Sequence, residues 1–277
     1  MVSLGVVGDA LPSHPAYGLL RPVTPYAAVL LAGNPSPMTL DGTNTWVLRA
    51  PGAPRCVVVD PGPDDDVHLR RVAGQGPVAH VLLTHGHPDH AAGARRFAEL
   101  VGAPVHAADP RHRLGSEGLT GGDVVPAAGL EIRVLATPGH TSDSLCFLID
   151  GDGTSAVLTG DTVLGRGSTV IAHPDGRLGD YLASLRRLAE LPPGVSVLPG
   201  HGPNLPDAGQ AARAYLVHRE QRLDQVRVAW AALRAQQSGE PDARQIVEIV
   251  YADVNPALWP AAAASVAAQL EYLRGRG

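Results

Sequence analysis

The sequence contains no lysine, so all 22 of its basic residues are arginines. The formal net charge of −5 at pH 7 gives no general attraction to nucleic acids or acidic membranes, although it leaves room for a local basic patch. Aromatic residues make up only 4% of the 277 residues, so the core must consist mostly of Val, Leu, Ile and Ala. With 44% hydrophobic residues, the composition is that of an ordinary globular protein.

Cysteine is also scarce, and long apolar runs are missing. Cys56 and Cys146 each lie within a short apolar run, which predicts two buried, reduced thiols in neighbouring strands rather than a disulfide. No apolar run approaches the roughly 20 residues that span a bilayer. The first residues lack the basic segment and apolar core of a signal peptide. We therefore expect a cytoplasmic protein with no membrane partner.

Short apolar runs, each followed by a loop that carries His or Asp, recur between about residues 25 and 200. Such runs are typical of buried strands, and helical patterns at about 91–101 and 180–191 lie between some of them. We expect two sheets with helices outside, over residues 1–205. The runs are Val57–Val59, Val78–Leu83, Ile132–Leu135, Ala156–Leu158 and Val195–Leu198.

Residues 206–277 have a different pattern. Asp207 is placed to cap a long helix that continues to about Gln237, and helical stretches follow at about 243–251 and 256–274. This segment contains eight Arg, four Asp and four Glu, so a solvated helix face explains its arginines more simply than a nucleic-acid surface does. We predict a small, all-helical C-terminal module.

A dense group of metal-binding side chains directly follows one predicted strand, namely His85, His87, Asp89 and His90. Imidazole and carboxylate groups are the usual ligands of zinc and similar ions. Residues two apart in an extended loop point to the same side, so His85 and His87 can hold one ion while Asp89 and His90 face a neighbouring position. A lone His is more often a surface or core residue, but this spacing predicts a metal site.

Three further residues, His140, Asp161 and His201, each take the first polar loop position after a predicted strand, beside a glycine. Each alone is more often not a ligand than a ligand. With the His85–His90 cluster, they complete one candidate site. Asp60 also ends a predicted strand, at a Pro-Gly turn. It either terminates that strand or accepts a hydrogen bond from a ligating imidazole, as such imidazoles usually require.

These motifs resemble the motif series of the metallo-β-lactamase superfamily over roughly residues 25–205. The resemblance implies an α/β fold, an αββα sandwich. It implies that His85, His87 and His140 hold one metal and that Asp89, His90 and His201 hold a second. Asp161 would bridge the two metals, and Asp60 would support a ligand from behind. The implied cofactor is two Zn²⁺ ions, with iron and manganese as alternatives. The implied nucleophile is a zinc-bound hydroxide, with Asp89 as the catalytic group that accepts or passes on a proton.

Departures from patterns within the superfamily narrow the reaction. Exported β-lactamases usually replace some of these ligands, most often with Cys at the position of Asp161, and redox di-iron members typically carry Glu at the position of His87. Only 40 positions separate Asp161 from His201, which leaves no room for the long insertion of the large nucleases. Residues 34–46, 161–169 and 250–260 resemble the β-lactamase-like protein 2 group. That group carries a small winged-helix-like tail, and we expect the tail here to lack its β-wing.

Characterised animal members of that group are single-strand-specific endoribonucleases, so the resemblance implies phosphodiester hydrolysis of single-stranded RNA. Asn44 and His173 are candidates for substrate contact, against plainer interpretations as a turn residue and a loop surface residue. The alternatives are a glyoxalase-II-like thioester hydrolase of small molecules, with weak β-lactamase side activity, and a mononuclear-iron persulfide dioxygenase. A partner-binding protein with structural metals is disfavoured, because structural zinc sites are normally closed by four protein ligands. A homodimer is left open.

Overall fold

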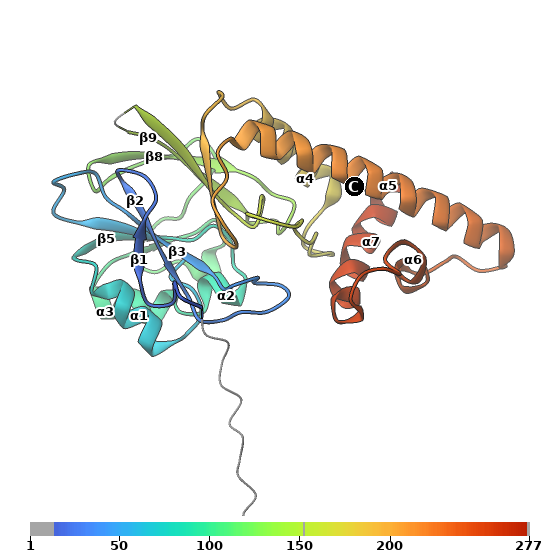
Figure 1. Ribbon diagram of the computed structural model, residues 1–277, viewed down its shortest axis with the longest axis horizontal. Coiled ribbons are helices and arrows are strands. Elements are labelled where there is room, and N and C mark those ends of the chain that lie inside the picture. Colours follow the sequence, from blue (N-terminus) through green and yellow to red (C-terminus); the bar gives the residue numbers. More distant parts are fainter. Residues whose placement is uncertain (1–13, 152, 276–277) are drawn as a thin grey trace, which may run out of the picture.

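Two β-sheets pack face to face in the computed structural model, which describes residues 14–151 and 153–275 (Figure 1). The first sheet has the strand order β1-β2-β3-β4-β5-β6, and the second has the order β11-β10-β9-β8-β7. The first sheet contains β1 Leu20–Pro22, β2 Ala27–Leu31, β3 Asn44–Leu48, β4 Cys56–Val59, β5 Val78–Leu82 and β6 Val105–His106. The second contains β7 Val124–Ala127, β8 Leu130–Ala136, β9 Leu145–Gly151, β10 Thr154–Gly160 and β11 Ser196–Pro199.

The core of the sandwich lies between the two sheets, where side chains such as Val57 and Leu82 meet Ile132, Phe147 and Leu158. All five are fully buried. The central strands β4 and β10 are apolar on both faces because helices cover their outer sides, which is why these runs lack a polar alternation. The five apolar runs singled out in the sequence all form strands, and the predicted αββα sandwich is confirmed.

Helices α1 Asp66–Ala73 and α3 Ala94–Val101 cover the first sheet, and α4 Leu178–Ala189 covers the second. The helix expected over about 91–101 is interrupted, because the short helix α2 spans Pro88–Ala91 and α3 begins only at Ala94. Gly93 lies at this break. A Cβ at Gly93 would be 2.7 Å from the Pro63 carbonyl oxygen, so the loop that carries the candidate ligands packs directly on its neighbour.

The C-terminal module consists of α5 Ala208–Gln236, α6 Ala243–Val250, the short 3₁₀ helix η2 Pro256–Leu258, and α7 Trp259–Leu273. Asp207 caps α5 as expected, since its carboxylate accepts from the backbone N–H of Gln210 at 2.6 Å. The first half of α5 packs on α4 and the second sheet, whereas its second half forms a separate small core with α6 and α7 (Figure 1). Up to Gly275, the described part of the module is free of strands.

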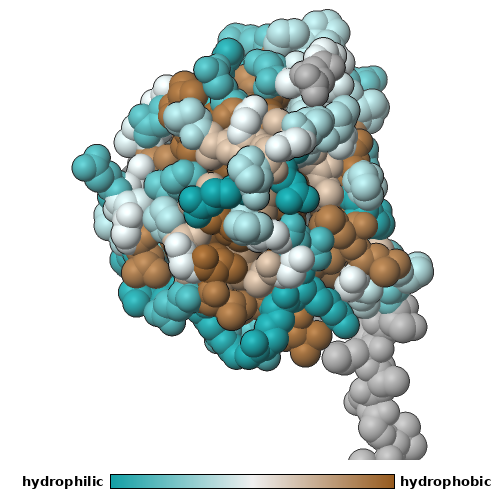
Figure 2. All heavy atoms as spheres, turned by 90° about the vertical axis from the view of Figure 1, so that its left-hand side faces the viewer, coloured by the Kyte–Doolittle hydropathy of each residue, from teal (hydrophilic) through white to brown (hydrophobic). Residues whose placement is uncertain are grey.

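Both cysteines are buried and free, but they do not lie in neighbouring strands. Cys56 belongs to β4 of the first sheet and Cys146 to β9 of the second. That expectation was wrong because each apolar run joins a different sheet. On the face shown in Figure 2, hydrophobic side chains occur as separate groups among hydrophilic ones. None of the helices within residues 14–151 and 153–275 is long and apolar enough to cross a membrane.

Candidate metal centre

The seven candidate ligands converge from four loops at one edge of the sandwich. The first segment follows β5 and carries residues 85–90, which continue into α2, and the other three loops follow β8, β10 and β11. The loops meet because the strands that precede them end at the same edge of the packed sheets. Three overlapping groups of ligand atoms lie within 4.8 Å of one another: His85, His87 and His140; His85, His90 and Asp161; and Asp89, His90 and His201.

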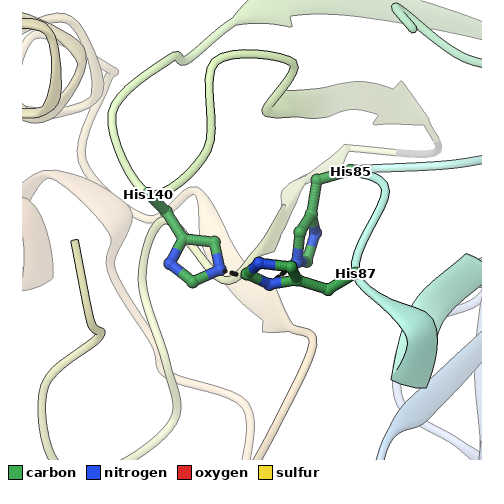
Figure 3. A group of neighbouring side chains, drawn as sticks. All are labelled: His85, His87 and His140. Carbon is green, nitrogen blue, oxygen red and sulfur yellow. Dashed lines mark hydrogen bonds between the residues drawn. The ribbon is translucent and has the colours of Figure 1, made fainter. Parts of the chain in front are cut away.

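The first group consists of three imidazoles that point toward one another (Figure 3). His87 Nδ1 lies 3.1 Å from His85 Nε2 and 3.0 Å from His140 Nε2. Burial lowers the pKa of both His85 and His140, so these rings are neutral and each has a lone pair to offer. Two Zn–N bonds of about 2.0–2.1 Å at a tetrahedral angle place their nitrogens about 3.3 Å apart. The spacing therefore suits ligands around one ion.

The second group combines two imidazoles and one carboxylate. His201 Nε2 lies 3.0 Å from Asp89 Oδ2 and 3.2 Å from His90 Nε2. Burial lowers the pKa of His201, but Asp161 and Asp89 raise it more, to about 9. The two carboxylates thus favour positive charge in this group, either on a protonated imidazole or on a bound cation.

Asp161 lies between the two groups. Its Oδ1 is 3.4 Å from His90 Nε2 and 3.5 Å from His201 Nε2, and its Oδ2 is 3.7 Å from His140 Nε2. Burial raises the pKa of this carboxyl, but His201 and His90 lower it far more, so Asp161 is ionised. Its buried Oδ1 has no hydrogen-bond partner. Because an unpartnered buried acceptor is costly, this atom is suited to bind a cation.

Asp60 supports the centre from behind the ligands. Its carboxylate accepts from the Thr84 backbone N–H at 2.8 Å and from the Thr84 hydroxyl at 2.7 Å. Its Oδ2 also lies 2.8 Å from His90 Nδ1, and its side chain is 2% exposed. The contact orients the His90 ring so that Nε2 faces the other ligands. Of the two interpretations of Asp60, the geometry favours hydrogen bonding to an imidazole.

Two ligands are oriented by backbone carbonyls that the sequence analysis did not identify. His140 Nδ1 lies 2.5 Å from the Val170 carbonyl oxygen, and His201 Nδ1 lies 3.0 Å from that of Gly42. Thr84 was also missed, although its hydroxyl lies 3.0 Å from His85 Nδ1. Its place between β5 and the ligand cluster was a usable signal. The sequence does not indicate these two carbonyls, because every residue has a backbone carbonyl.

The Asn44 side chain contacts the loop that carries His201, and its predicted substrate contact stays a prediction. Its side chain is buried, and its amide nitrogen donates to the carbonyls of Pro199 and Gly202, at 3.0 and 2.9 Å. Asn44 therefore holds the loop that carries His201, and its hydrogens are not free for substrate. His173 lies at the rim of the centre, where its Nε2 is 2.9 Å from Glu271 Oε2 of α7. Substrate contact by His173 stays a prediction.

A cavity of about 670 Å³ extends from His140 and Asp161 to the C-terminal module. Much of its wall is apolar, with contributions from Met38, Leu40, Leu164, Val254 and Leu258. A smaller cavity of about 320 Å³ shares Met38, His140 and Asp161 with the first one and is also lined by His87, Asp89 and His173. Candidate ligands are thus accessible from a pocket that the sandwich and the module form together.

Comparison with known proteins agrees with this architecture. Residues 38–201 match the family described as the metallo-beta-lactamase superfamily, and residues 243–277 match the beta-lactamase associated winged helix domain. A metallo-beta-lactamase family protein from Thermus thermophilus has the same fold, with a TM-score of 0.74 and 25% identity, covering 92% of this chain and 95% of its own. The predicted winged-helix-like module is confirmed.

Two curated relatives are each 31% identical to this chain. The first is an atrochrysone carboxyl ACP thioesterase of Aspergillus fumigatus, aligned over 266 residues, or 90% of this chain and 79% of the relative. The second is a beta-lactamase-like protein 2 homolog of Drosophila melanogaster, aligned over 274 residues, or 90% of this chain and 87% of the relative. Both alignments extend beyond the residues that match the superfamily and into the module.

Proposed function

The chain belongs to the metallo-beta-lactamase superfamily and is a hydrolase of that fold, and from this premise we propose that it hydrolyses a thioester with two bound metal ions. The observation that carries the proposal is the cavity of about 670 Å³ beside His140 and Asp161. Its apolar walls suit an acyl group, whereas a strand of RNA presents a charged phosphate at every nucleotide. The relationship to an acyl-carrier thioesterase supports the same substrate class.

The seven ligands divide naturally between two ions. His85, His87 and His140 would hold the first ion, and Asp89, His90 and His201 the second. Asp161 lies between the two groups and would contribute its carboxylate to both ions. When bound, such ions polarise a carbonyl oxygen and supply a water nucleophile at neutral pH. Zinc is the metal we propose, because imidazole and carboxylate donors suit it, and iron and manganese are alternatives.

Asp89 is the residue that we propose as proton carrier. Its side chain is 26% exposed, the most open among the carboxylates of the centre, and it lines the smaller cavity. In the reaction, the water oxygen bonds to the acyl carbon, the C–S bond breaks, and the water proton passes through Asp89 to the departing sulfur. Since a thiol has a pKa of about 8.5, this leaving group needs little help from an acid. An RNA alkoxide would need much more.

The endoribonuclease prediction remains the main competing function. The net charge of −5 and the equal numbers of arginines and acidic residues in the module give no general attraction to an RNA backbone, and the apolar part of the cavity wall suits an acyl chain. Persulfide oxidation and cephalosporin cleavage are alternative functions that fewer observations support. A single panel separates these reactions because each has a distinct product.

The test uses protein loaded with zinc, with manganese or with iron in parallel. We would measure kcat/KM for acyl-N-acetylcysteamine thioesters, S-lactoylglutathione, single-stranded RNA, a chromogenic cephalosporin and a persulfide. We expect thioesters to be the best substrates, with activity lost on chelation and in Asp161→Asn while the circular dichroism spectrum is kept. RNA cleavage without thioester hydrolysis, or oxygen uptake by protein with one iron, would overturn the proposal.

A further inference from the structure

Helix α5 contributes one histidine and two arginines to the wall of the cavity of about 670 Å³, namely His218, Arg219 and Arg222. Burial and the two neighbouring arginines lower the pKa of His218, so the positive charge on this wall comes from Arg219 and Arg222. A third arginine, Arg166, also lines the cavity, but its guanidinium is paired with the Asp41 carboxylate at 2.6 and 3.0 Å. Among the described residues, the only carboxylate that lines the cavity is Asp161, whose neighbours are the imidazoles of the centre. The α5 wall is therefore electropositive.

Arg219 is only 5% exposed, although arginine is almost never buried without a charged partner. Its guanidinium lies over the Tyr181 ring, with Cζ 5.2 Å from the ring centroid, and one terminal nitrogen donates to the Thr169 carbonyl. Its Nε is buried and has no hydrogen-bond partner. The ring and the carbonyl hold the guanidinium in place without neutralising its charge.

Arg222 lies one turn further along α5 and is held in the same manner. Its Cζ is 4.4 Å from the Tyr251 ring centroid, and its Nη1 donates to the Val250 carbonyl at 2.9 Å. Within residues 14–151 and 153–275, neither Arg219 nor Arg222 forms an ion pair, in contrast to Arg166. Two fixed guanidinium groups thus face one cavity and lack a counter-ion.

We propose that Arg219 and Arg222 form an anion subsite, which selects thioesters that carry a carboxylate or phosphate away from the scissile carbonyl. A buried charge without a partner is destabilising, and an incoming anion would compensate it. Guanidinium groups suit both anions, since their fork of donors matches carboxylate and phosphate oxygens. This inference rests on the proposed thioester hydrolysis and specifies its substrate class.

The position of the subsite sets the shape of that substrate. His140 and Asp161 of the candidate centre, the two arginines, and the apolar side chains of Leu164, Val254 and Leu258 line the same cavity. A fitting substrate has a reactive carbonyl, an apolar body and a terminal anion. The anion can belong to the acyl part, as a carboxylate, or to the thiol part, as the phosphate of a carrier such as coenzyme A.

The test compares matched thioesters with the zinc-loaded protein. One arm uses N-acetylcysteamine thioesters of glutaric, adipic, pimelic and suberic acids against the neutral acyl chains of the same lengths. The other compares coenzyme A and N-acetylcysteamine thioesters of one neutral acyl group. We expect the anionic member of at least one arm to have a kcat/KM higher by on the order of ten- to hundredfold, as for a hydrogen-bonded charge.

Variants assign that preference to the subsite. Arg222→Gln and Arg219→Gln should reduce the ratio of anionic to neutral kcat/KM toward one, and Arg219→Lys should restore it in part. Arg227→Gln is the matched control, because Arg227 lies on the same helix, outside the cavity, and pairs with Asp224. If Arg219→Gln does not fold, Arg222→Gln still gives the answer, since its side chain is only partly buried.

The outcomes separate this inference from the proposed function. If both arms show equal rates for anionic and neutral thioesters, the subsite is refuted while thioester hydrolysis stands. If no thioester is cleaved, calorimetric binding of dicarboxylates against monocarboxylates of equal length still tests the subsite. Tighter dicarboxylate binding that Arg222→Gln removes would support the subsite, and equal binding would refute it.

Discussion

At the scale of single residues, Asp60 shows how the candidate centre is held in place. Its backbone has a φ of 52°, a left-handed conformation that costs a non-glycine residue about 1–3 kcal/mol. The contacts to Thr84 and His90 compensate that cost, and they aim one carboxylate at a ligand and at the loop that carries it. Strain of this kind is typical of sites whose geometry matters for function.

Asp60→Asn tests this role. An amide group keeps the shape but has one acceptor oxygen instead of two, so the contacts to Thr84 and His90 cannot all be kept. We expect zinc affinity or thioester kcat/KM to fall by about ten- to hundredfold, as for other residues behind metal ligands. Asp64→Asn is the control, because Asp64 is exposed and pairs with Arg96. Equal zinc content and rates in both variants would show that Asp60 merely ends a strand.

A second residue-scale prediction concerns His68, which is buried beside Thr45 with its Nε2 2.9 Å from the hydroxyl oxygen. Burial lowers the pKa of His68 to about 4, against about 6.5 in the unfolded chain. The folded state therefore binds fewer protons, and the stability that neutral His68 contributes is complete above about pH 6.5 and is lost toward pH 4.

His68→Gln keeps a polar group beside Thr45 and removes this titration. In chelator, where metal binding does not contribute, we expect the free energy of unfolding of the wild type to fall more than that of the variant between pH 7 and pH 4. The difference should be on the order of 2 kcal/mol. Parallel denaturation curves at all pH values would contradict the buried, neutral state of His68.

The ligand types were predictable from the sequence because metal chemistry limits them to few residues. His85 to His90, His140, Asp161 and His201 follow strands, and the structure brings all of them together. The loop contacts of Asn44 were not predictable, because a buried amide that holds a loop and an exposed amide that contacts substrate have the same local sequence. Arg219 was treated as part of a solvated face, since its aromatic neighbour Tyr181 lies far away in the chain.

At the scale of elements, the strand-to-loop junctions position the ligands, and small residues let these loops pack closely. Gly200 follows β11, and a Cβ there would lie 2.7 Å from both Asp161 Oδ1 and His90 Cε1. The strands themselves were predictable from apolar runs, whereas the break between α2 and α3 depends on a contact with the Pro63 loop. The helical spacing of apolar residues in this segment does not indicate that contact.

Gly200→Ala should therefore displace ligands while leaving the sheets intact. We expect a loss of stability of about 1–3 kcal/mol from overpacking, together with fewer zinc ions per chain and a lower kcat. Gly33→Ala is the matched control, since a Cβ at Gly33 meets nothing within 4 Å. Metal content would be measured by elemental analysis after gel filtration. Zinc content equal to that of the control would argue against close packing of the ligands around Gly200.

At the scale of the whole molecule, the module and the sandwich share both a core and a cavity. Ala212 and Tyr215 of α5 pack with Val157 and Val197 of the second sheet, and the Tyr215 hydroxyl accepts from the Leu164 backbone N–H at 3.0 Å. The sequence indicated a change of pattern near residue 206, but not how the module returns to the centre. The division at 205 and 206 and a homodimer stay predictions.

The module is therefore part of the cavity and of the core, and is not only attached to the sandwich. The sandwich supplies the candidate ligands, and the module supplies part of the cavity wall, including Arg219 and Arg222. Apolar burial between α5 and the second sheet fixes the two parts together, so changes in the module are expected to alter substrate choice before they alter metal content.

The most direct test of the two-metal thioester hydrolase is a zinc titration of metal-free protein, with bound zinc and thioester hydrolysis followed in the same samples. We expect hydrolysis to be absent without metal and to rise until about two ions are bound per chain, because both ligand groups are needed around Asp161. Hydrolysis that persists without metal, or that is already maximal with one ion per chain, would contradict it.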